Sequence, residues 1–497
     1  MNKVTILLFG ILLAGSATAQ VDRDDFDRQR QQAHDQYAQQ RDKMKQQYDE
    51  ARRKAEAEYA AFRKKANEDY AAAVQRAWQQ MGVEPAVPKP TEPAPPRPSP
   101  PIPGKIPSST PLPQDEVVLP PIDITPVPLP PIPEPEPAVP TMQFAMYGAP
   151  CSVHAHAEVL RFKLPSLEEK SIAAAWEQLS QDKYDGLLHD CMAQREALHL
   201  SDWGYLQLLG CMSEQLLGKG SNEAVLLQMY LLAQSGYCVR MARANEHLVL
   251  LMPFNRTIYG YRFLNIDGVK HYVLSHEKAD GVYVCAVAFP REQVANILMG
   301  QLPELGGGVK RSRTLQAEKF GTMKATVSVD ERLMNYMRDY PLSDAWDYYA
   351  LAGLSDEVKG SLYPALRGQI DGKSKRKAAG MLLDFVQTAF DYATDQEQFG
   401  YERPLFGDES IYYPKNDCED RSIFYSILVR DLLGLDVVLV HWPGHLATAV
   451  AFPEEVPGDY FTVDGRRYTV CDPTYIGASI GETMPQFKNV NAKLVRL

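Results

Sequence analysis

The hydrophobic positions of the N-terminal part of the chain follow an 11-residue repeat. One row of the repeat consists of Phe26, Tyr37, Tyr48, Tyr59, Tyr70 and Met81, and a second row consists of Ala33, Met44, Ala55, Ala66 and Ala77. This period corresponds to about 3.67 residues per helical turn, so both rows lie on one stripe of a nearly straight helix. The repeat predicts a long charged helix over residues 20–82. Its aromatic stripe favours self-association as a coiled coil; the alternative is a lone helix held by i,i+4 ion pairs, each contributing only about 0.2–0.5 kcal/mol.

Proline sets the character of the next segment. Residues 85–140 contain 23 of the 37 prolines in the chain. Proline fixes φ and has no backbone N–H, so such sequences adopt extended polyproline-II conformations and do not pack into a core. We therefore expect a proline-rich disordered linker over residues 83–141. It acts as a spacer, or alternatively as a docking segment for a partner that recognises polyproline II.

The remaining sequence contains two stretches that look like copies of one another. In each stretch an apolar helical run is followed by a glycine, an apolar strand, a histidine and a second strand. The matched pairs, each 198 positions apart, are Gly236 with Gly434 and His247 with His445. Both stretches then place Asp-Gly, a strong hairpin-turn signal, between two strands. The pattern predicts an α+β fold that is duplicated, with one module over residues 142–305 and another over residues 310–497.

Three reactive residue types stand at element ends in the second stretch. Cys418 comes directly after Asn416 and Asp417, either of which can cap the apolar helix that follows. His445 opens one strand, and Asp472 closes another. Because adjacent strands lie about 4.8 Å apart, we expect His445 and Asp472 to meet across the sheet.

These residue types suit nucleophilic catalysis by a thiolate. A helix N-terminus and an imidazolium both stabilise a cysteine thiolate. A histidine can take the thiol proton and later protonate a leaving group, while a carboxylate fixes the tautomer of the histidine. The acidic neighbours of the cysteine, Asp417, Glu419 and Asp420, are expected to oppose the thiolate, and Arg421 offsets part of that effect.

The order of these residues resembles the transglutaminase-like superfamily. The cysteine is followed after 27 residues by the histidine, and after another 27 by an Asp-Pro-Thr motif. Further motifs of exported transglutaminase-like proteins, mostly from Bacteroidetes, are matched by Phe385-Val386-Gln387, Phe399-Gly400-Tyr401-Glu402, Asp417-Cys418-Glu419-Asp420-Arg421 and Pro443-Gly444-His445. The resemblance covers residues 375–485. It implies a papain-like α+β fold in which Cys418 is the nucleophile, His445 the base and Asp472 the residue that orients the base.

The resemblance also implies a group that stabilises the oxyanion of the tetrahedral intermediate. Tyr412, Tyr413 and the backbone N–H of Cys418 are the candidates that the sequence offers. Cys471, beside Asp472, is expected in the core, since a disulfide between Cys471 and Cys418 would remove the nucleophile.

The first stretch does not keep the three reactive residues together. The position that matches Cys418 is Gly220, and the position that matches Asp472 falls near Ser275 or His276. We therefore expect the first module to be a degenerate, noncatalytic transglutaminase-like module. It would pack on the active module or shape its cleft.

The N-terminus has the pattern of a signal peptide, residues 1–19. Lys3 precedes an apolar run that is too short to span a membrane, and Ala17-Thr18-Ala19 is a small-residue cleavage motif. Ser16 stands where a lipoprotein would carry cysteine. We expect export to the periplasm, the cell envelope or the exterior, without a lipid anchor and without an integral membrane segment after cleavage. The alternative is an N-terminal anchor that is retained.

Composition narrows the choice of ligands. The net charge of -11 argues against nucleic acid and against anionic membranes as partners. The seven cysteines are irregularly spaced and include no CxxC motif, so we predict neither a metal site nor a cofactor. An odd number of cysteines leaves at least one thiol unpaired in an exported chain.

The residues and the resemblance together predict an exported cysteine enzyme that acts on amide bonds of a peptide or protein substrate. Hydrolysis, by a peptidase or amidase, is favoured over amine transfer by a crosslinking transglutaminase, because the bacterial relatives are thought of mainly as peptidases. Two alternatives are noncatalytic: an envelope protein that binds peptides or proteins, and an assembly scaffold built on the long helix. The acidic flank of Cys418 favours a noncatalytic protein.

Overall fold

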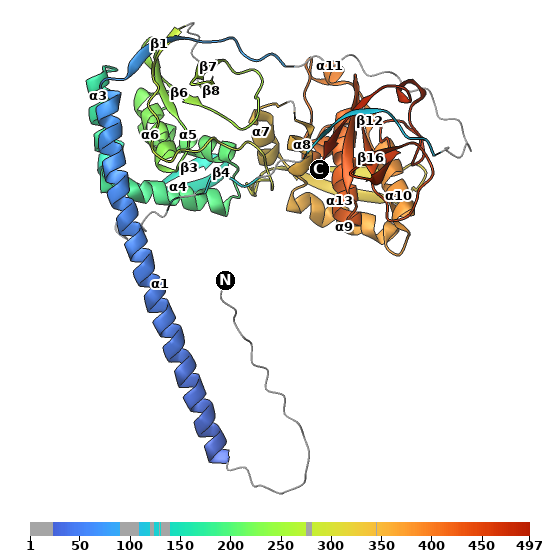
Figure 1. Cartoon of the computed structure of the whole chain (residues 1–497), viewed down its shortest axis with the longest axis horizontal. Coiled ribbons are helices and arrows are strands. Elements are labelled where there is room, and N and C mark those ends of the chain that lie inside the picture. Colours follow the sequence, from blue (N-terminus) through green and yellow to red (C-terminus); the bar gives the residue numbers. More distant parts are fainter. Residues whose placement is uncertain are drawn as a thin grey trace. The chain divides into compact units, whose positions relative to one another are not determined.

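The computed structural model describes residues 23–89, 109–119, 124–128, 130, 140–274, 281–343 and 345–497. These residues form an α+β protein with two six-stranded sheets (Figure 1). The chain divides into two compact units, Met1–Ala61 and Phe62–Leu497. The predicted signal peptide and the positions near Ser275 and His276 lie outside the described residues. No helix within the described ranges combines the length and the hydropathy that a membrane span requires.

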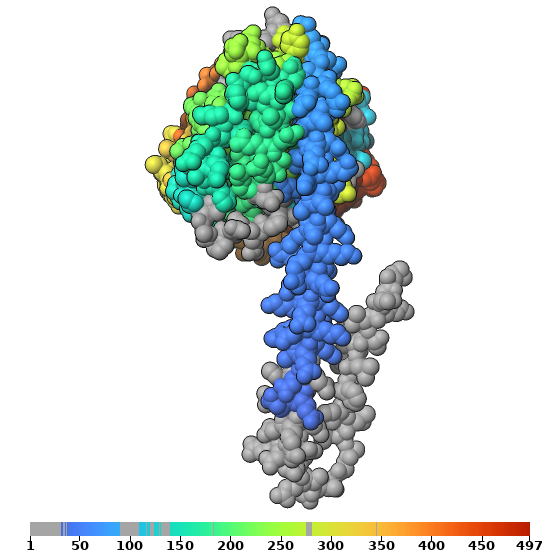
Figure 2. All heavy atoms as spheres, turned by 90° about the vertical axis from the view of Figure 1, so that its left-hand side faces the viewer, coloured from blue at the N-terminus to red at the C-terminus, as the bar shows by residue number. Residues whose placement is uncertain are grey.

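The long helix α1 (Arg23–Val74) carries the 11-residue repeat. Before residue 62 its stripe is exposed, with Tyr37, Met44 and Tyr48 at 69, 69 and 68% exposure. From Phe62 onward the stripe is buried against the globular part of the chain, as Figure 2 shows. The Tyr70 ring lies 4.5 Å from that of Trp176. The C-terminal end of the stripe therefore has a partner within the chain, and self-association stays a prediction for the part before residue 62.

The predicted helix over residues 20–82 is wrong at its C-terminal end. α1 stops at Val74, and Trp78–Gly82 form strand β1. The indole Nε1 of Trp78 donates to the carbonyl of Val74 at 2.6 Å, which satisfies one of the carbonyls left open at a helix end. β1 pairs antiparallel with β9 (Gly281–Cys285), a long-range pairing that the helical repeat does not encode.

The proline-rich segment also packs in places, contrary to the predicted disordered linker over residues 83–141. Gln114–Val118 form β2, which lies parallel to β18 (Ala492–Arg496) at the edge of a sheet. Leu112 and Val127 are buried, and the backbone N–H of Val127 donates to Asp202 at 3.0 Å. The residues between the prolines have apolar side chains that can be buried and backbone N–H groups that can donate hydrogen bonds. Both kinds of group contact the globular part of the chain.

The two sheets have the same strand order. The sheet of the first half, residues 142–305 with β1 added, runs β1, β9, β5 (Arg240–Ala244), β6 (His247–Met252), β8 (Val269–Val273) and β7 (Phe263–Ile266). The sheet of the second half, residues 310–497 with β2 added, runs β2, β18, β14 (Val437–Trp442), β15 (His445–Val450), β17 (Arg466–Cys471) and β16 (Tyr460–Val463). Only the edge differs, because β1 is antiparallel to its neighbour and β2 is parallel. A common strand order is what a duplication would produce, and the duplication itself stays a prediction.

Helices and short hairpins complete both halves. The first half contains β3 (Thr141–Met146), β4 (Ala149–His154), α2 (Ala157–Leu160), α3 (Glu169–Leu179), α4 (Asp185–Ala197), α5 (Asp202–Leu217) and α6 (Asn222–Gln234). The second half begins with β10 (Lys310–Gln316), β11 (Lys324–Asp330), α7 (Glu331–Asp339), α8 (Trp346–Leu351) and α9 (Asp356–Ile370). It continues with α10 (Lys375–Thr388), β12 (Asp391–Tyr392), α11 (Asp395–Gln398), α12 (Gly407–Tyr412), β13 (Lys415–Asn416) and α13 (Cys418–Leu433).

α13 is the central helix of the second half. It packs against α8, α10 and α12 and against strands β14 and β15. Its first twelve residues are all buried, charged ones included. The sequence-based prediction of a core helix that begins at Cys418 is therefore confirmed.

The two predicted Asp-Gly hairpins are confirmed. Asp267 and Gly268 have φ values of 51° and 81°, and Asp464 and Gly465 have 49° and 73°. Positive φ at both turn residues is the geometry that matches the twist of a two-residue hairpin. The second of these hairpins, β16–β17, presents Asp472 at its end.

Candidate active site

Cys418 is the first residue of α13, and Asp417 is its N-cap. The carboxylate of Asp420 accepts hydrogen bonds from the N–H of Asp417 at 3.3 Å and from the N–H of Leu405 at 2.8 Å. These bonds hold the first turn of the helix in place. The partial positive charge of a helix N-terminus lowers the free energy of a thiolate at this position.

His445 and Asp472 meet across the sheet, as the sequence predicts. His445 opens β15 opposite Trp442, and Asp472 follows directly after β17, which pairs with β15. The His445 Nε2 and the Asp472 Oδ2 lie 2.9 Å apart. The structure thus joins the histidine and the carboxylate that the sequence places 27 residues apart.

Cys418 completes the group, which we call the triad. Cys418 and Asp472 both act on the His445 ring, and each raises its pKa. Burial lowers the pKa of His445, but the charge and hydrogen bond of Asp472 and the contact with Cys418 outweigh it and raise the pKa to about 10. The ring therefore carries a proton at neutral pH, which is the state that balances a thiolate.

The triad is closed off from solvent. Cys418, His445 and Asp472 are 5, 2 and 2% exposed. The His445 ring stacks on Phe487 with centroids 5.1 Å apart, and Trp442 continues the stack. A substrate must therefore displace covering side chains before it reaches the sulfur.

The loop that carries Asp472 is fixed by a buried glutamine. Asp472 Oδ1 accepts from the backbone N–H groups of Thr474 and Tyr475 at 2.9 and 3.1 Å. The Gln387 Nε2 donates to the carbonyls of Asp472 and Tyr475 at 3.0 and 2.9 Å. Gln387 belongs to the Phe-Val-Gln motif that carries part of the family resemblance, and its contacts give that motif a physical role.

Comparisons of the chain with models of protein families and with curated protein sequences find no match. The function must therefore be argued from the residues themselves.

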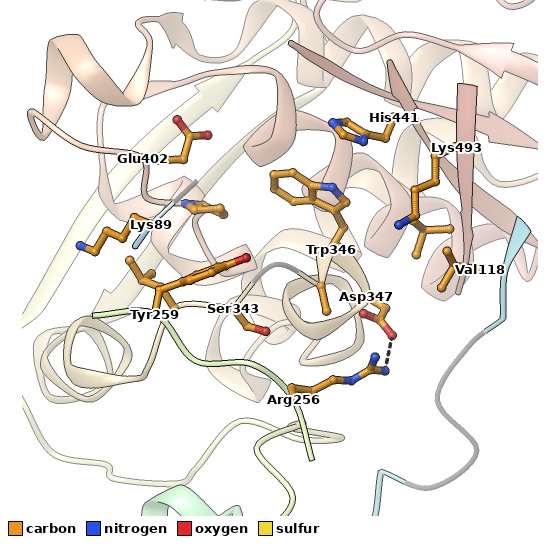
Figure 3. A pocket seen from close by; sticks show the side chains of 14 residues that line it. Lys89, Val118, Arg256, Tyr259, Ser343, Trp346, Asp347, Glu402, His441 and Lys493 are labelled. Carbon is orange, nitrogen blue, oxygen red and sulfur yellow. Dashed lines mark hydrogen bonds and ion pairs between the residues drawn. The ribbon is translucent and has the colours of Figure 1, made fainter. Parts of the chain in front are cut away.

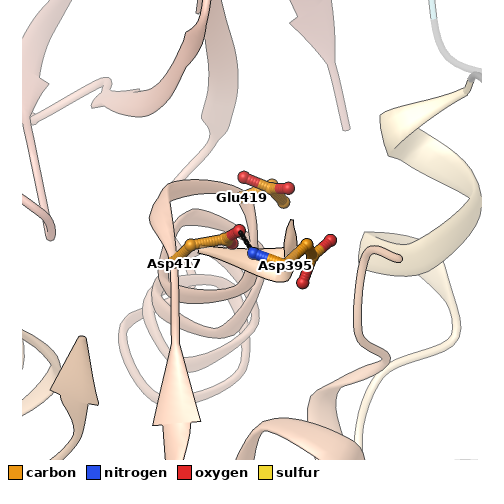
Figure 4. A group of neighbouring side chains, drawn as sticks. All are labelled: Asp395, Asp417 and Glu419. Atoms are coloured by element: carbon orange, nitrogen blue, oxygen red, sulfur yellow. Dashed lines mark hydrogen bonds between the residues drawn. The ribbon is translucent and has the colours of Figure 1, made fainter. Parts of the chain in front are cut away.

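The acidic neighbours of Cys418 form a buried cluster with Asp395 (Figure 4). Ligand oxygens of Asp395, Asp417 and Glu419 lie within 4.8 Å of one another, so these side chains could hold a hard cation. Burial raises the pKa of Asp395 to about 9 and that of Asp417 to about 6. Burial also holds the pKa values of Glu419 and Asp420 well above the usual range. Burial therefore favours the protonated form of all four carboxyls, and Asp395 carries a proton at neutral pH.

The effect of Glu419 on the Cys418 thiolate depends on whether Glu419 is protonated. The Cys418 Sγ and the Glu419 Oε2 lie 3.0 Å apart, within hydrogen-bond reach. A protonated Glu419 can donate to a thiolate, whereas an ionised one would repel it. The expectation from the sequence that Asp417, Glu419 and Asp420 oppose the thiolate assumes that these side chains are ionised. Their burial favours the protonated form, which does not repel a thiolate.

The buried cluster makes stability depend on pH in a definite direction. In the unfolded chain these carboxyls lose their protons near pH 4, whereas in the folded chain Asp395 keeps its proton to about pH 9 and the pKa of Glu419 also lies well above its usual range. The folded state thus binds more protons between these limits, and each extra proton lowers the free energy of unfolding by about 1.4 kcal/mol per pH unit. Urea unfolding from pH 5 to pH 9 should show this fall, and Glu419→Gln should flatten it. The exposed Glu454→Gln serves as the control, and an unchanged slope in Glu419→Gln would contradict the proton assignment.

A tyrosine that sequence reasoning missed lies on the strand that pairs with the residues directly before Cys418. Tyr392 in β12 is opposite Asn416 of β13, two residues before Cys418. Desolvation and the charge of Cys418 raise the pKa of Tyr392. The residue is 39% exposed, and its ring centroid lies 5.5 Å from the Arg421 guanidinium. The two-residue strand that positions Tyr392 has no recognisable sequence signal.

The two tyrosines named from the sequence are engaged elsewhere. Tyr412 lies under Arg311, whose guanidinium is 4.9 Å from the ring centroid. Tyr413 packs edge-on against Phe399 at 5.2 Å. Tyr392, whose strand pairs with the residues directly before Cys418, is a third tyrosine candidate.

The described residues of the first half do not bring a cysteine, a histidine and an aspartate together at the positions that match the triad. His247 occupies the same hairpin position as His445 but is exposed on the surface. Gly220, the predicted match of Cys418, lies in the turn before α6, and Asn222 is the first residue of that helix. The side-chain amide of Asn222 donates to the carbonyl of Glu246 at 3.0 Å and accepts from the N–H of Leu248 at 2.8 Å. Asn222 therefore has a structural role.

All seven cysteines, each within the described ranges, are free thiols. Cys471 is buried and its Sγ points to the carbonyl of Thr469 at 3.6 Å. No disulfide joins Cys418 to Cys471, and the core position predicted for Cys471 is confirmed.

Proposed function

We propose that the protein is an exported cysteine enzyme of the transglutaminase-like, papain-like type that transfers acyl groups from amide bonds of a peptide or protein. The observation that supports the proposal is the position of His445, which lies 2.9 Å from Asp472 and whose pKa is raised by both Asp472 and Cys418. A cysteine at a helix N-terminus, an imidazolium and a buried carboxylate together are the parts that thiolate catalysis needs.

The acylation step follows from this geometry. His445 holds the proton of the Cys418 thiol, and the thiolate attacks the amide carbonyl carbon to form a carbon–sulfur bond. The carbonyl π electrons move to the oxygen. When the tetrahedral intermediate collapses, the carbon–nitrogen bond breaks, and His445 gives its proton to the departing amine. A thioester to Cys418 remains.

Deacylation reverses these roles. His445, now neutral, takes a proton from water, and the hydroxide oxygen attacks the thioester carbon. When the intermediate collapses, the carbon–sulfur bond breaks and a carboxylic acid leaves, while His445 keeps the proton taken from water and the thiolate–imidazolium pair is restored. With an amine in place of water the product would be a new amide. We favour water as the acceptor on the strength of the family resemblance.

Two donors suit the oxyanion of the intermediate: the backbone N–H of Cys418 and the hydroxyl of Tyr392. We predict that Tyr392→Phe lowers the acylation rate about 10²-fold, the loss typical of removing one oxyanion donor. The rate of p-nitrophenolate release from p-nitrophenyl acetate measures this effect. Tyr412→Phe is the matched control, and equal rates in wild type and Tyr392→Phe would remove Tyr392 from the mechanism.

The proposal is tested by trapping the acyl group. After brief reaction with p-nitrophenyl acetate and quenching in acid, mass spectrometry of the digested chain should find one acetyl group on Cys418. The half-buried thiol of Cys211 and the buried thiol of Cys471 serve as internal controls. The proposal would be contradicted if acetyl groups were found on several cysteines or if none were found on Cys418.

A noncatalytic peptide-binding or assembly protein is the second candidate. The specific observation in its favour is the burial of all three triad side chains beneath Phe487 and Trp442. In that case Cys418 would stay unreactive toward small acylating reagents as well as toward peptides. The same trapping experiment therefore separates the two candidates.

A further inference from the structure

The side chain of Gln387, near the C-terminal end of α10, holds together the loop that begins at Asp472. Gln387 is 2% exposed. In addition to its bonds to the carbonyls of Asp472 and Tyr475, its Nε2 donates to the carbonyl of Ala478 at 3.3 Å. Its Oε1 accepts from the N–H of Gly477 at 3.3 Å. Both ends of the amide are therefore bonded, and they contact the loop at its beginning and at its end.

The shape of this loop sets the direction of the Asp472 carboxylate. The Asp472 Oδ2 lies 2.9 Å from the His445 Nε2. The Asp472 Oδ1 accepts from the N–H groups of Thr474 and Tyr475, which belong to the same loop. Because the loop orients its own carboxylate, the carboxylate stays directed at the histidine only while the loop keeps its shape. Gln387 therefore acts on the triad through Asp472.

The main chain of Gln387 is bonded to the helix that carries the nucleophile. The guanidinium of Arg421, a residue that is 1% exposed, donates to the carbonyls of Gln387 and Phe390 at 3.2 and 2.7 Å. The last carbonyls of a helix have no partner within the helix, and their partial negative charge attracts cations. Arg421 lies in the first turn of α13, three residues after Cys418, and α10 and α13 pack against each other (Figure 1). Arg421 thus ties the first turn of α13 to the end of α10.

Another buried hydrogen bond joins α13 to the strand of the histidine. The hydroxyl of Ser422, which is fully buried, donates to the carbonyl of Leu446 at 2.9 Å. Leu446 follows His445 in β15. The side chains of Gln387, Arg421 and Ser422 therefore connect the three segments of the chain that carry the triad.

A cavity in the unit Phe62–Leu497 takes no part in this connection. Its volume is about 310 Å³, and its lining includes Tyr259, Trp346 and His441 (Figure 3). Among the described residues that line it are none of the triad and none of the three connecting side chains. The substitution Tyr259→Phe changes this lining and leaves the connecting hydrogen bonds in place, so it can serve as a control.

We propose that Gln387 is a positioning residue of the triad. Its side-chain amide keeps the Asp472 carboxylate directed at His445, and its main-chain carbonyl holds Arg421 and, with it, the first turn of α13. The inference rests on the proposed function, because it requires that the triad activate Cys418. Without the amide the loop is free to change shape, His445 loses its carboxylate partner, and the thiolate loses the imidazolium that stabilises it.

The test is the rate at which iodoacetamide alkylates Cys418 at pH 6.5, divided by the rate at pH 9, in the full chain. Gln387→Met keeps the length of the side chain but removes its amide. Gln387→Asn keeps the amide but withdraws it by one methylene. Each substitution should lower this ratio by about tenfold or more, because a misplacement of about 1 Å in an active site can cost about 10²-fold in rate.

Gln234→Met and Gln234→Asn are the matched controls. Gln234 is also a buried helical glutamine, 1% exposed, but its side chain bonds Arg63 and Asn67 of α1. These variants and Tyr259→Phe should keep the wild-type ratio even where they lower stability. An unchanged ratio in a Gln387 variant that folds, as judged by near-ultraviolet circular dichroism, would overturn the proposal, and so would an equal loss in the Gln234 variants. One folded Gln387 variant is enough for the decision.

Failure of the proposed function gives a different result in the same measurement. In that case the wild-type chain itself would react at pH 6.5 far more slowly than at pH 9. The positioning role alone fails if the wild type reacts well at both pH values and the Gln387 variants do so too.

Discussion

Exchanging His445 for alanine is expected to slow acylation of Cys418 by about 10²–10⁴-fold at pH 7, the range typical of a lost general acid–base group. The positive charge of the His445 imidazolium stabilises the thiolate, and Asp472, 2.9 Å away, keeps the imidazole protonated. Without the ring the thiol must ionise unaided in a buried site. The rate of the p-nitrophenolate burst measures the loss.

His154→Ala is the matched control, because His154 is also paired with a carboxylate, Asp190 at 2.9 Å, but lies in the first half. Its burst rate should equal that of the wild type. A His445→Ala variant that folds and keeps the wild-type burst rate would contradict the assigned role. Near-ultraviolet circular dichroism distinguishes a folded variant from a collapsed one.

Replacing Arg403 with leucine is expected to lower the free energy of unfolding by about 3–5 kcal/mol, the range for breaking a buried ion pair from one side. Arg403 and Glu409 are 5 and 1% exposed, and their side chains meet at 2.5 Å. Burial already raises the pKa of Glu409, and Arg403 is the main opposing influence. Removal of the guanidinium leaves a buried carboxyl without its partner. Urea denaturation at pH 7 measures the change.

The double variant Arg403→Leu with Glu409→Leu should recover most of this loss, since no buried charge is then left unpaired. The comparison isolates the unpaired carboxylate from any loss of packing around residue 403. A double variant as unstable as Arg403→Leu alone would show that packing against Phe399 and Tyr413 dominates instead. The result also bears on the candidate site, because the backbone N–H of Arg403 donates to Asp395 in the acidic cluster.

Local sequence patterns predict the scaffold of the triad well. The cap at Asp417, the apolar face of α13 and the hairpin around Asp464 each depend on neighbours only a few residues apart. Once those elements are placed, the 4.8 Å spacing typical of strands is enough to bring His445 to Asp472. The strand order that both halves share follows the repeat that the sequence displays.

Long-range pairing and burial are what the sequence does not reveal. β1 and β2 become edge strands because sheets elsewhere in the chain offer open edges, and neither segment has a strand pattern of its own. Tyr392 is brought to Cys418 by a two-residue strand. Burial raises the pKa of Glu419, and the burial of a glutamate cannot be predicted from its residue type.

The reaction of Cys418 with iodoacetamide across pH tests the central claim most directly, because it reports activation of the sulfur without any assumption about substrate. Peptide mapping separates Cys418 from the six other thiols. If His445 and Asp472 activate Cys418, the thiol should react at pH 6.5 nearly as fast as at pH 9, and His445→Ala should confine the reaction to alkaline pH. A rate that rises around pH 8.5, the value of an ordinary free thiol, in both wild type and His445→Ala would contradict the account.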